Sequence, residues 1–150
     1  MPKVYLIGTT HLYQFGPTPF TPILAVQFDE FRELLRQSAR RNQVRAIAEE
    51  MSLEALTLRN LKESIPKQIA AELGLGHRYC DPNKSTRKEK RISANSEREA
   101  YWRDQILTMD LFPVLYVCGA DHVRGFSKLL SESGIPVDIT ALDWESKATG

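Results

Sequence analysis

The same short pattern occurs twice in this chain, once near each end. Residues 4–11 read Val-Tyr-Leu-Ile-Gly-Thr-Thr-His, and residues 115–122 read Leu-Tyr-Val-Cys-Gly-Ala-Asp-His. Each copy is an apolar run short enough to be a buried strand, followed by a glycine that allows a sharp turn and by a histidine three positions later. Because ligands bind beyond the carboxyl ends of parallel strands, the pattern predicts that His11 and His122 meet in one crevice.

Strand and helix patterns alternate along the rest of the chain. Apolar residues recur at helical spacing over about 27–41, and the apolar run at 44–48 predicts a buried strand. Further helices are expected at about 53–62, 66–74, 96–107 and 121–133, and further strands at 3–7, 77–80, 113–118 and 135–139. The alternation predicts an α/β fold with a mostly parallel central sheet and helices on both faces, in a single compact domain over residues 1–150.

Two polar segments interrupt this pattern. Residues 83–94 are expected to form a mobile basic loop. Their first nine residues, 83–91, contain no apolar side chain. A polar tail is expected at about 141–150. The basic residues of the first segment are Lys84, Arg87, Lys88, Lys90 and Arg91.

Composition narrows the classes of partner and compartment. Twenty Lys and Arg residues against nineteen Asp and Glu give a net charge of +1, and no aromatic residue interrupts the basic segment, so nucleic acid is not an expected partner. No apolar run reaches the ~18 residues of a membrane span, and no leader pattern is expected at the N-terminus. Cys80 and Cys118 follow apolar or aromatic residues in expected strands, which favours buried, reduced thiols and a cytoplasmic location.

Carboxylates also follow the expected strands. Glu49 and Glu50 end one of them, and Asp81 ends another. Two imidazoles and a carboxylate suit a divalent metal such as Mn, Co or Zn, which would lower the pKa of a bound water towards ~7. The expected ligands are His11, His122 and Glu49, which follows its strand directly, with Glu50 as the alternative. Without a metal, one histidine acts as general base beside a carboxylate. Both routes lead to hydrolysis.

Several of these residues have structural interpretations that stay open. Asp81 precedes Pro82, a common turn dipeptide, although it is also a candidate for substrate binding. Asp121 is placed to cap a helix. Thr10 either satisfies the backbone of the turn or binds an oxyanion or substrate carbonyl. His77 begins an expected strand and is expected to lie away from the site.

The motifs together resemble those of the TraB/TIKI, erythromycin-esterase-like and ChaN-like superfamily. That group is similar in its paired G-x-x-H motifs, in a glutamate after an intervening strand, and in a helix with the pattern E-R-[DN]-x-x-[MW]. The resemblance implies an arginine in the crevice that binds a carboxylate or phosphate. Arg98 and Arg103 are the candidates, and their separation by five positions lets at most one point inward. The matching positions are Gly8, His11, Glu49 or Glu50, Glu97, Arg98, Glu99, Trp102, Arg103, Gly119 and His122.

Members of the superfamily include a metal-dependent peptidase, esterases that open macrolide lactones and a haem-binding lipoprotein. The expected function is therefore a hydrolase that cleaves ester or peptide bonds in a small molecule or peptide. Two alternatives are a non-catalytic module that binds a metal or haem, and a regulatory or defence protein that binds an anionic or nucleotide ligand beneath the basic segment. The chain is compact beside typical members, so two alternatives stay open: the substrate is small, or a homodimer or a partner chain completes the pocket.

Overall fold

The computed structural model describes residues 2–148. They contain one five-stranded sheet with helices around it. All neighbouring strands run parallel, in the order β3-β2-β4-β1-β5. This confirms the predicted α/β class with a parallel central sheet. The strands are β1 (Val4–Thr9), β2 (Ala46–Glu49), β3 (Gly76–Tyr79), β4 (Val114–Gly119) and β5 (Val137–Trp144).

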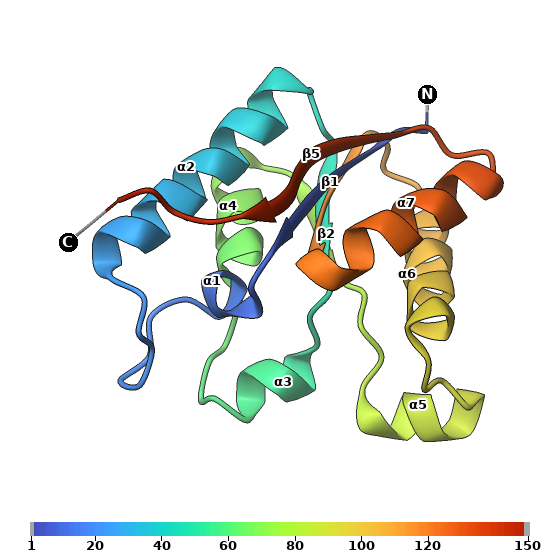
Figure 1. The fold of residues 1–150 in the computed structure, drawn as a ribbon, viewed down its shortest axis with the longest axis horizontal. Helices are drawn as coiled ribbons and strands as arrows, with labels where there is room; N and C mark the ends of the chain where they lie inside the picture. The colour runs from blue at the N-terminus through green and yellow to red at the C-terminus, as the bar shows by residue number, and fades with distance from the viewer. Residues whose placement is uncertain (1, 149–150) are drawn as a thin grey trace.

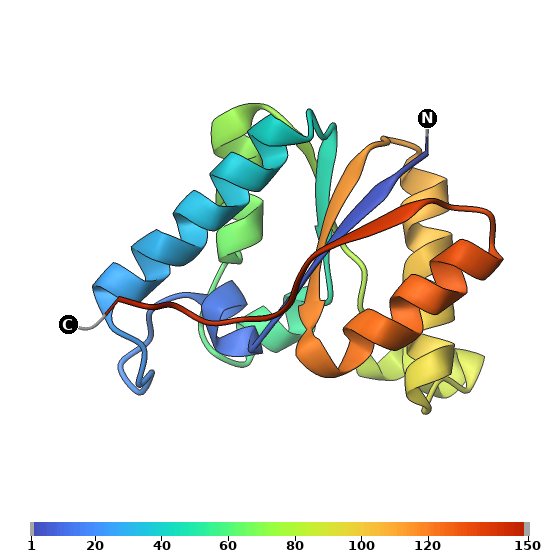
Figure 2. The same ribbon diagram turned by 45° about the horizontal axis from the view of Figure 1, so that its top comes forward.

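Helices cover both faces of the sheet (Figures 1 and 2). On one face lie α2 (Ala25–Arg41) and α4 (Ile65–Leu73), and on the other lie α6 (Asn95–Met109) and α7 (Val123–Glu132). Shorter helices follow the strands at the end of the sheet towards which the arrow of β1 points in Figure 1, which we call the carboxyl edge. They are α1 (His11–Phe15), α3 (Leu53–Thr57), α5 (Lys84–Lys90) and the 3₁₀ turn η1 (Ala120–His122).

Each face of the sheet packs its own apolar cluster. On the α6 and α7 side, Trp102, Tyr116 and Phe126 are fully buried and their rings contact one another. On the α2 and α4 side, Phe28 and Phe31 fill the corresponding space. The central strand β4 is buried along its whole length because helices cover it on both sides, which explains its continuous apolar run.

The basic segment is not a loop over most of its length. Residues Lys84–Lys90 form α5, and the side chain of Asn83 caps this helix by accepting a hydrogen bond from Thr86 N at 3.1 Å. Arg91 ends it in the left-handed conformation, with φ of 56°. The expectation of a loop over 83–94 was wrong because a capped run of Lys, Arg and Glu forms a helix without burying an apolar face.

The polar tail begins later than expected, because β5 continues to Trp144. Trp144 packs edge-on against Tyr13, with ring centroids 5.0 Å apart. Beyond the strand, Glu30 accepts hydrogen bonds from Ser146 Oγ and from the backbone nitrogens of Lys147 and Ala148. The end of the expected tail, residues 149–150, lies outside the described residues.

Neither glycine of the repeated motif makes a sharp turn. Gly8 lies within β1, and Gly119 has φ of −62° and ψ of 143°, which any residue adopts. A Cβ atom on Gly8 would lie 2.2 Å from the carbonyl oxygen of Leu142, where the register between β1 and β5 is irregular. Gly8 is therefore required by the close approach of β5.

Substituting Gly8→Ala is expected to lower the free energy of unfolding by about 2 kcal/mol, because the new methyl group overlaps a backbone oxygen that cannot rotate away. Urea unfolding followed by circular dichroism measures this change. A loss below about 0.5 kcal/mol, the range of an ordinary surface substitution, would contradict the explanation.

Both cysteines are free and buried, as the sequence indicated. Burial raises the pKa of the Cys80 thiol to about 12, and it also raises that of Cys118. Both side chains therefore stay protonated and unreactive at neutral pH. Among residues 2–148, no helix has the length and apolar character needed to cross a bilayer.

Candidate active site

The two strands that carry the repeated motif lie next to each other, and their chain connections leave in opposite directions. After β1 the chain passes through α1 to α2 on one face, whereas after β4 it passes through η1 to α7 on the other. Such a switch point opens a crevice at the carboxyl edge of a parallel sheet. His11 begins α1 and His122 ends η1, so both predicted histidines lie at this crevice.

Glu50 lies between the two imidazoles. His11 Nε2 is 3.4 Å from Glu50 Oε1, and His122 Nε2 is 3.5 Å from Glu50 Oε2. Oε1 also accepts a hydrogen bond from Gly119 N at 2.8 Å, and Oε2 accepts one from Arg98 Nη2 at 2.5 Å. Burial by itself would raise the pKa of this carboxyl, but hydrogen bonds and charge from its neighbours outweigh burial and lower it to about 2.

Glu49, the carboxylate preferred as a metal ligand from the sequence, lies on the opposite face of the sheet. Glu49 is the last residue of β2, and Glu50 follows it directly and still donates its backbone N–H to Val117 O of β4. Successive side chains of extended backbone point to opposite faces, which separates the two carboxylates. Glu49 is fully buried and bonds to Ser64 at the start of α4 and to His77. The set His11, His122 and Glu49 is therefore not brought together, and Glu50 takes the position expected of Glu49.

His122 is held by the carboxylate of Glu99, a position that matches the superfamily motif but for which the sequence predicted no role. Its Nδ1 lies 2.8 Å from Glu99 Oε2, and both residues are buried. The ring of Trp102 meets the imidazole edge-on, with centroids 4.8 Å apart. Gly125 makes room for this pair, since a Cβ there would lie 2.8 Å from Glu99 Oε1. The spacing of Glu99 and Trp102 on one helical face was the signal available in the sequence.

His11 is held by Gln14, one turn along α1. Gln14 Oε1 lies 2.8 Å from His11 Nδ1, and the His11 side chain is 43% exposed, so its Nε2 side can meet a ligand. Burial favours a lower pKa for this imidazole, but the hydrogen bond and charge of Glu50, together with Gln14, raise it overall. Gln14 was missed because one glutamine at helical spacing from a histidine is a common pattern.

Arg98 enters the crevice and Asp81 positions it. Asp81 Oδ1 accepts hydrogen bonds from Arg98 Nε and Nη2 and from Trp102 Nε1, and its Oδ2 accepts one from Arg87 Nη2 at 2.6 Å. Both oxygens of Asp81 accept hydrogen bonds, and two of those bonds hold Arg98 in place. That Asp81 binds substrate stays a prediction. Burial favours a lower pKa for Arg98, but the charges of Asp81 and Glu50 outweigh burial, so the pKa is raised overall.

Arg103, the other candidate arginine, lies outside the crevice. Its side chain donates to Asp104 and to Ser133 Oγ in exposed surroundings. Asp121 makes no capping hydrogen bond and is exposed at the crevice. Thr10 accepts a long hydrogen bond from Leu12 N at 3.5 Å as the cap of α1, and it is also exposed there. Thr10 thus keeps both of the roles considered for it.

The side chains of His11, Glu50, Arg98 and His122 line a cleft of about 460 Å³. A smaller hollow of about 260 Å³ shares His11, Glu50 and Arg98 with it, so these three residues lie in the wall between the two spaces. The cleft wall is rich in charged and polar groups, which does not suit the broad apolar face of haem. The lining comprises Thr9, Thr10, His11, Glu50, Asn95, Arg98, Gly119, Ala120, Asp121, His122, Asp143 and Glu145.

The donor set also fits a divalent metal poorly. A metal between the histidines would need His122 Nε2 and Glu50 Oε2, but the guanidinium of Arg98 lies 3.5 Å from the first and 2.5 Å from the second. A fixed positive charge at that point repels a cation. Within residues 2–148, no group of three or more His, Cys, Asp or Glu side chains has an arrangement able to hold a metal.

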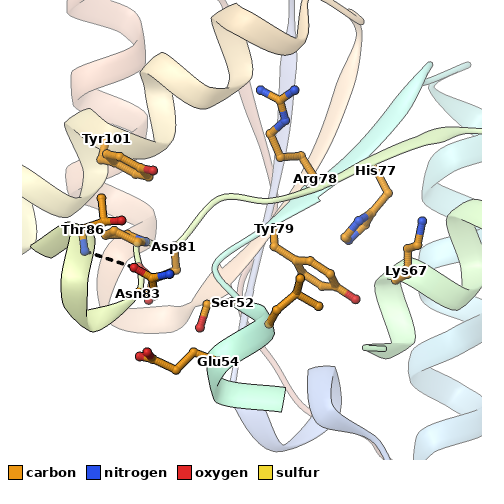
Figure 3. Close-up of a pocket in the computed structure, with 12 residues that line it drawn as sticks. Ser52, Glu54, Lys67, His77, Arg78, Tyr79, Asp81, Asn83, Thr86 and Tyr101 are labelled. Carbon is orange, nitrogen blue, oxygen red and sulfur yellow. Dashed lines mark hydrogen bonds between the residues drawn. The ribbon is translucent and has the colours of Figure 1, made fainter. Parts of the chain in front are cut away.

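A separate cleft of about 450 Å³ lies at the β3 end of the carboxyl edge (Figure 3). In this view His77 and Lys67 lie on one side of Tyr79, and Asp81, Asn83 and Tyr101 lie on the other. Asp81 and Ser52 also line the small hollow beside Arg98, so the two spaces share part of their walls. His77 belongs to this separate cleft, in line with its expected absence from the main site.

Comparison with protein-family models, with curated proteins and with solved structures found no match to this chain. The resemblance to the superfamily named above therefore stays an expectation. What the crevice can do chemically depends on its own side chains. They are the partly exposed imidazole of His11, the imidazole of His122 held by a buried carboxylate, and the guanidinium of Arg98 held by two carboxylates.

Proposed function

We propose that this protein is a hydrolase that cleaves ester or peptide bonds at the crevice between β1 and β4. One observation carries the proposal: the Nε2 atoms of His11 and His122 approach the same buried carboxylate, Glu50, at 3.4 and 3.5 Å, on the wall of an open cleft. Paired imidazoles with different surroundings suit one proton acceptor and one proton donor.

His11 is the proposed general base. Its Nδ1 faces Gln14 and its Nε2 side is accessible, so Nε2 can take a proton from a water molecule as that water attacks a carbonyl carbon. The raised pKa makes the imidazole a stronger base and lets Glu50 stabilise the imidazolium that forms. In this scheme Glu50 is not the nucleophile, because both of its oxygens already accept hydrogen bonds.

Arg98 and His122 serve the later steps of this proposal. The guanidinium, held by Glu50 and Asp81, supplies positive charge for the oxyanion of the tetrahedral intermediate. His122, oriented by Glu99, donates a proton to the leaving oxygen or nitrogen as its bond to carbon breaks. The proton on His11 then passes to solvent and His122 takes a proton back from solvent, which restores the starting state of both imidazoles.

The expected result of His11→Ala is a loss of kcat of about 100-fold to 10,000-fold, with a similar loss for His122→Ala. The substrates are p-nitrophenyl esters of short acids, peptide p-nitroanilides and p-nitrophenyl phosphate. Arg103→Ala, on the same helix as Arg98 but outside the crevice, is the matched control and should retain activity. The base must be neutral to act, so kcat/KM should rise with pH. The midpoint of that rise should lie above pH 6.5, because the pKa of His11 is raised.

Turnover that survives in both histidine variants would overturn the proposal. Hydrolysis of the phosphate ester alone would favour the alternative of an anionic ligand. Activity that is lost with a chelator and restored by Mn, Co or Zn would favour the metal-dependent form, in which Arg98 would have to move away from His122 and Glu50. The cytoplasmic location belongs to the same proposal and is supported by the two buried, reduced thiols.

A further inference from the structure

A buried hydrogen-bond chain connects Glu49 to His11 behind the crevice. Gln14 Nε2 donates to Glu49 Oε1 at 3.0 Å, and Gln14 Oε1 lies 2.8 Å from His11 Nδ1. The side chains of Glu49 and Gln14 are both inaccessible to solvent. Water therefore does not compete for these hydrogen bonds, and each group must satisfy its neighbour.

The surroundings of Gln14 determine which way its amide faces. Its Nε2 lies near two acceptors, Glu49 Oε1 at 3.0 Å and the backbone carbonyl oxygen of Glu50 at 3.3 Å. Turning the amide over would place its oxygen against both of these oxygens and leave buried acceptors without a donor. Gln14 Oε1 therefore faces His11, and this atom can only accept.

Glu49 is fixed in turn by donors on its other oxygen. Ser64 Oγ donates to Glu49 Oε2 at 2.5 Å, and His77 Nε2 lies 2.6 Å from the same atom. Ser64 Oγ also accepts a hydrogen bond from Lys67 N, so its hydroxyl hydrogen is available to Glu49. The remaining oxygen of Glu49 is left for Gln14.

We infer that Glu49 and Gln14 are positioning residues that hold neutral His11 with its proton on Nδ1 and leave Nε2 bare. The competing influence is Glu50 Oε1, which lies 3.4 Å from Nε2 and favours a proton on that nitrogen. The contact to Gln14 is the shorter of the two, at 2.8 Å, so the proton of neutral His11 stays on Nδ1. The catalytic consequence rests on the proposed function, because a bare Nε2 is what a general base needs.

Nitrogen-15 spectra of the histidine rings test this inference directly. The protein is labelled with ¹⁵N-histidine and measured at about pH 9, where imidazole is neutral. His11 is assigned among the three histidines by comparison with His11→Ala. We expect the pattern of an Nδ1-protonated ring in the parent protein and a shift to the Nε2-protonated ring in Gln14→Met, which removes the acceptor at similar volume. Gln37→Met, at an exposed position of α2, is the matched control and should leave the His11 pattern unchanged.

An Nε2-protonated His11 in the parent protein would overturn the inference, as would an unchanged tautomer in Gln14→Met. If Gln14→Met does not fold, Glu49→Gln provides the second variant. Ser64 donates to Oε2 of Glu49, so the new amide keeps its oxygen there and turns its NH2 towards Gln14, which should reverse the Gln14 amide and shift His11 to the Nε2-protonated ring. The tautomer needs no substrate, so it stays readable if the proposed hydrolase activity fails. Where turnover is measurable, Gln14→Met should lower kcat by about tenfold or more at nearly constant KM.

Discussion

Substituting Arg98→Ala is expected to lower the free energy of unfolding by about 3 kcal/mol. The guanidinium bonds to Glu50 and Asp81, whose side chains are 4% and 12% exposed. Removing it leaves two carboxylates side by side in a largely dry environment, with fewer donors and with mutual repulsion. Breaking a buried ion pair from one side costs more than the pair itself contributes, because the remaining charge is not rehydrated.

Urea unfolding of Arg98→Ala and Arg103→Ala at neutral pH measures the difference. Both residues lie on α6, but Arg103 bonds only to Asp104 and Ser133 among the described residues, in an exposed setting. The control should change stability by no more than about 0.5 kcal/mol. Equal effects of the two substitutions would mean that the buried network contributes no more than an ordinary surface contact.

Acid should unfold the protein partly through Glu50. The pKa of this carboxyl falls from a usual value of 4.5 to about 2 in the folded state. A lowered folded-state pKa gives stability that is fully present above pH 4.5 and is lost as pH falls from 4.5 through about 2. A shift of this size corresponds to about 3 kcal/mol.

The variant Glu50→Gln separates this contribution from general acid effects. It should be less stable than the parent at pH 7, and the difference between the two should shrink as pH falls through the window given above. Glu72→Gln removes an exposed carboxylate whose pKa is lowered by Arg36, and it should show a smaller change because solvent screens that pair. Parallel urea titrations at several pH values measure all three proteins, and a constant gap between parent and Glu50→Gln would contradict the assignment.

These two predictions concern the side chains that also carry the proposed chemistry. Glu50 bonds to Arg98 and lies against both imidazoles, so one network stabilises the fold and shapes the crevice. Variants of Glu50 or Arg98 are therefore ambiguous when only activity is measured. His11 gives a cleaner test of function, because its side chain is partly exposed and has fewer buried partners.

The repeated motif correctly predicted where its two histidines lie, but it did not predict what its two glycines do. Strand periodicity and the histidine spacing were enough to place His11 and His122 at one end of a parallel sheet. The explanation for the glycines was wrong, because neither turns the chain. Gly8 admits the backbone of β5, and Gly119 admits His11, since a Cβ there would lie 3.1 Å from His11 Nε2. Close approach between segments far apart in the chain leaves no local trace in the sequence.

The fold class, the buried thiols and the convergence of the two histidines could be predicted from the sequence, because they follow from periodicity, burial preference and the geometry of parallel strands. The choice between adjacent carboxylates was different. Alternation at the end of β2 sends Glu49 and Glu50 to opposite sides, but only the order of the strands and the packing of α6 decide which of the two meets the crevice. Tertiary structure likewise selected Glu99, Gln14 and Asp81, since a hydrogen-bond partner is fixed by where distant elements pack.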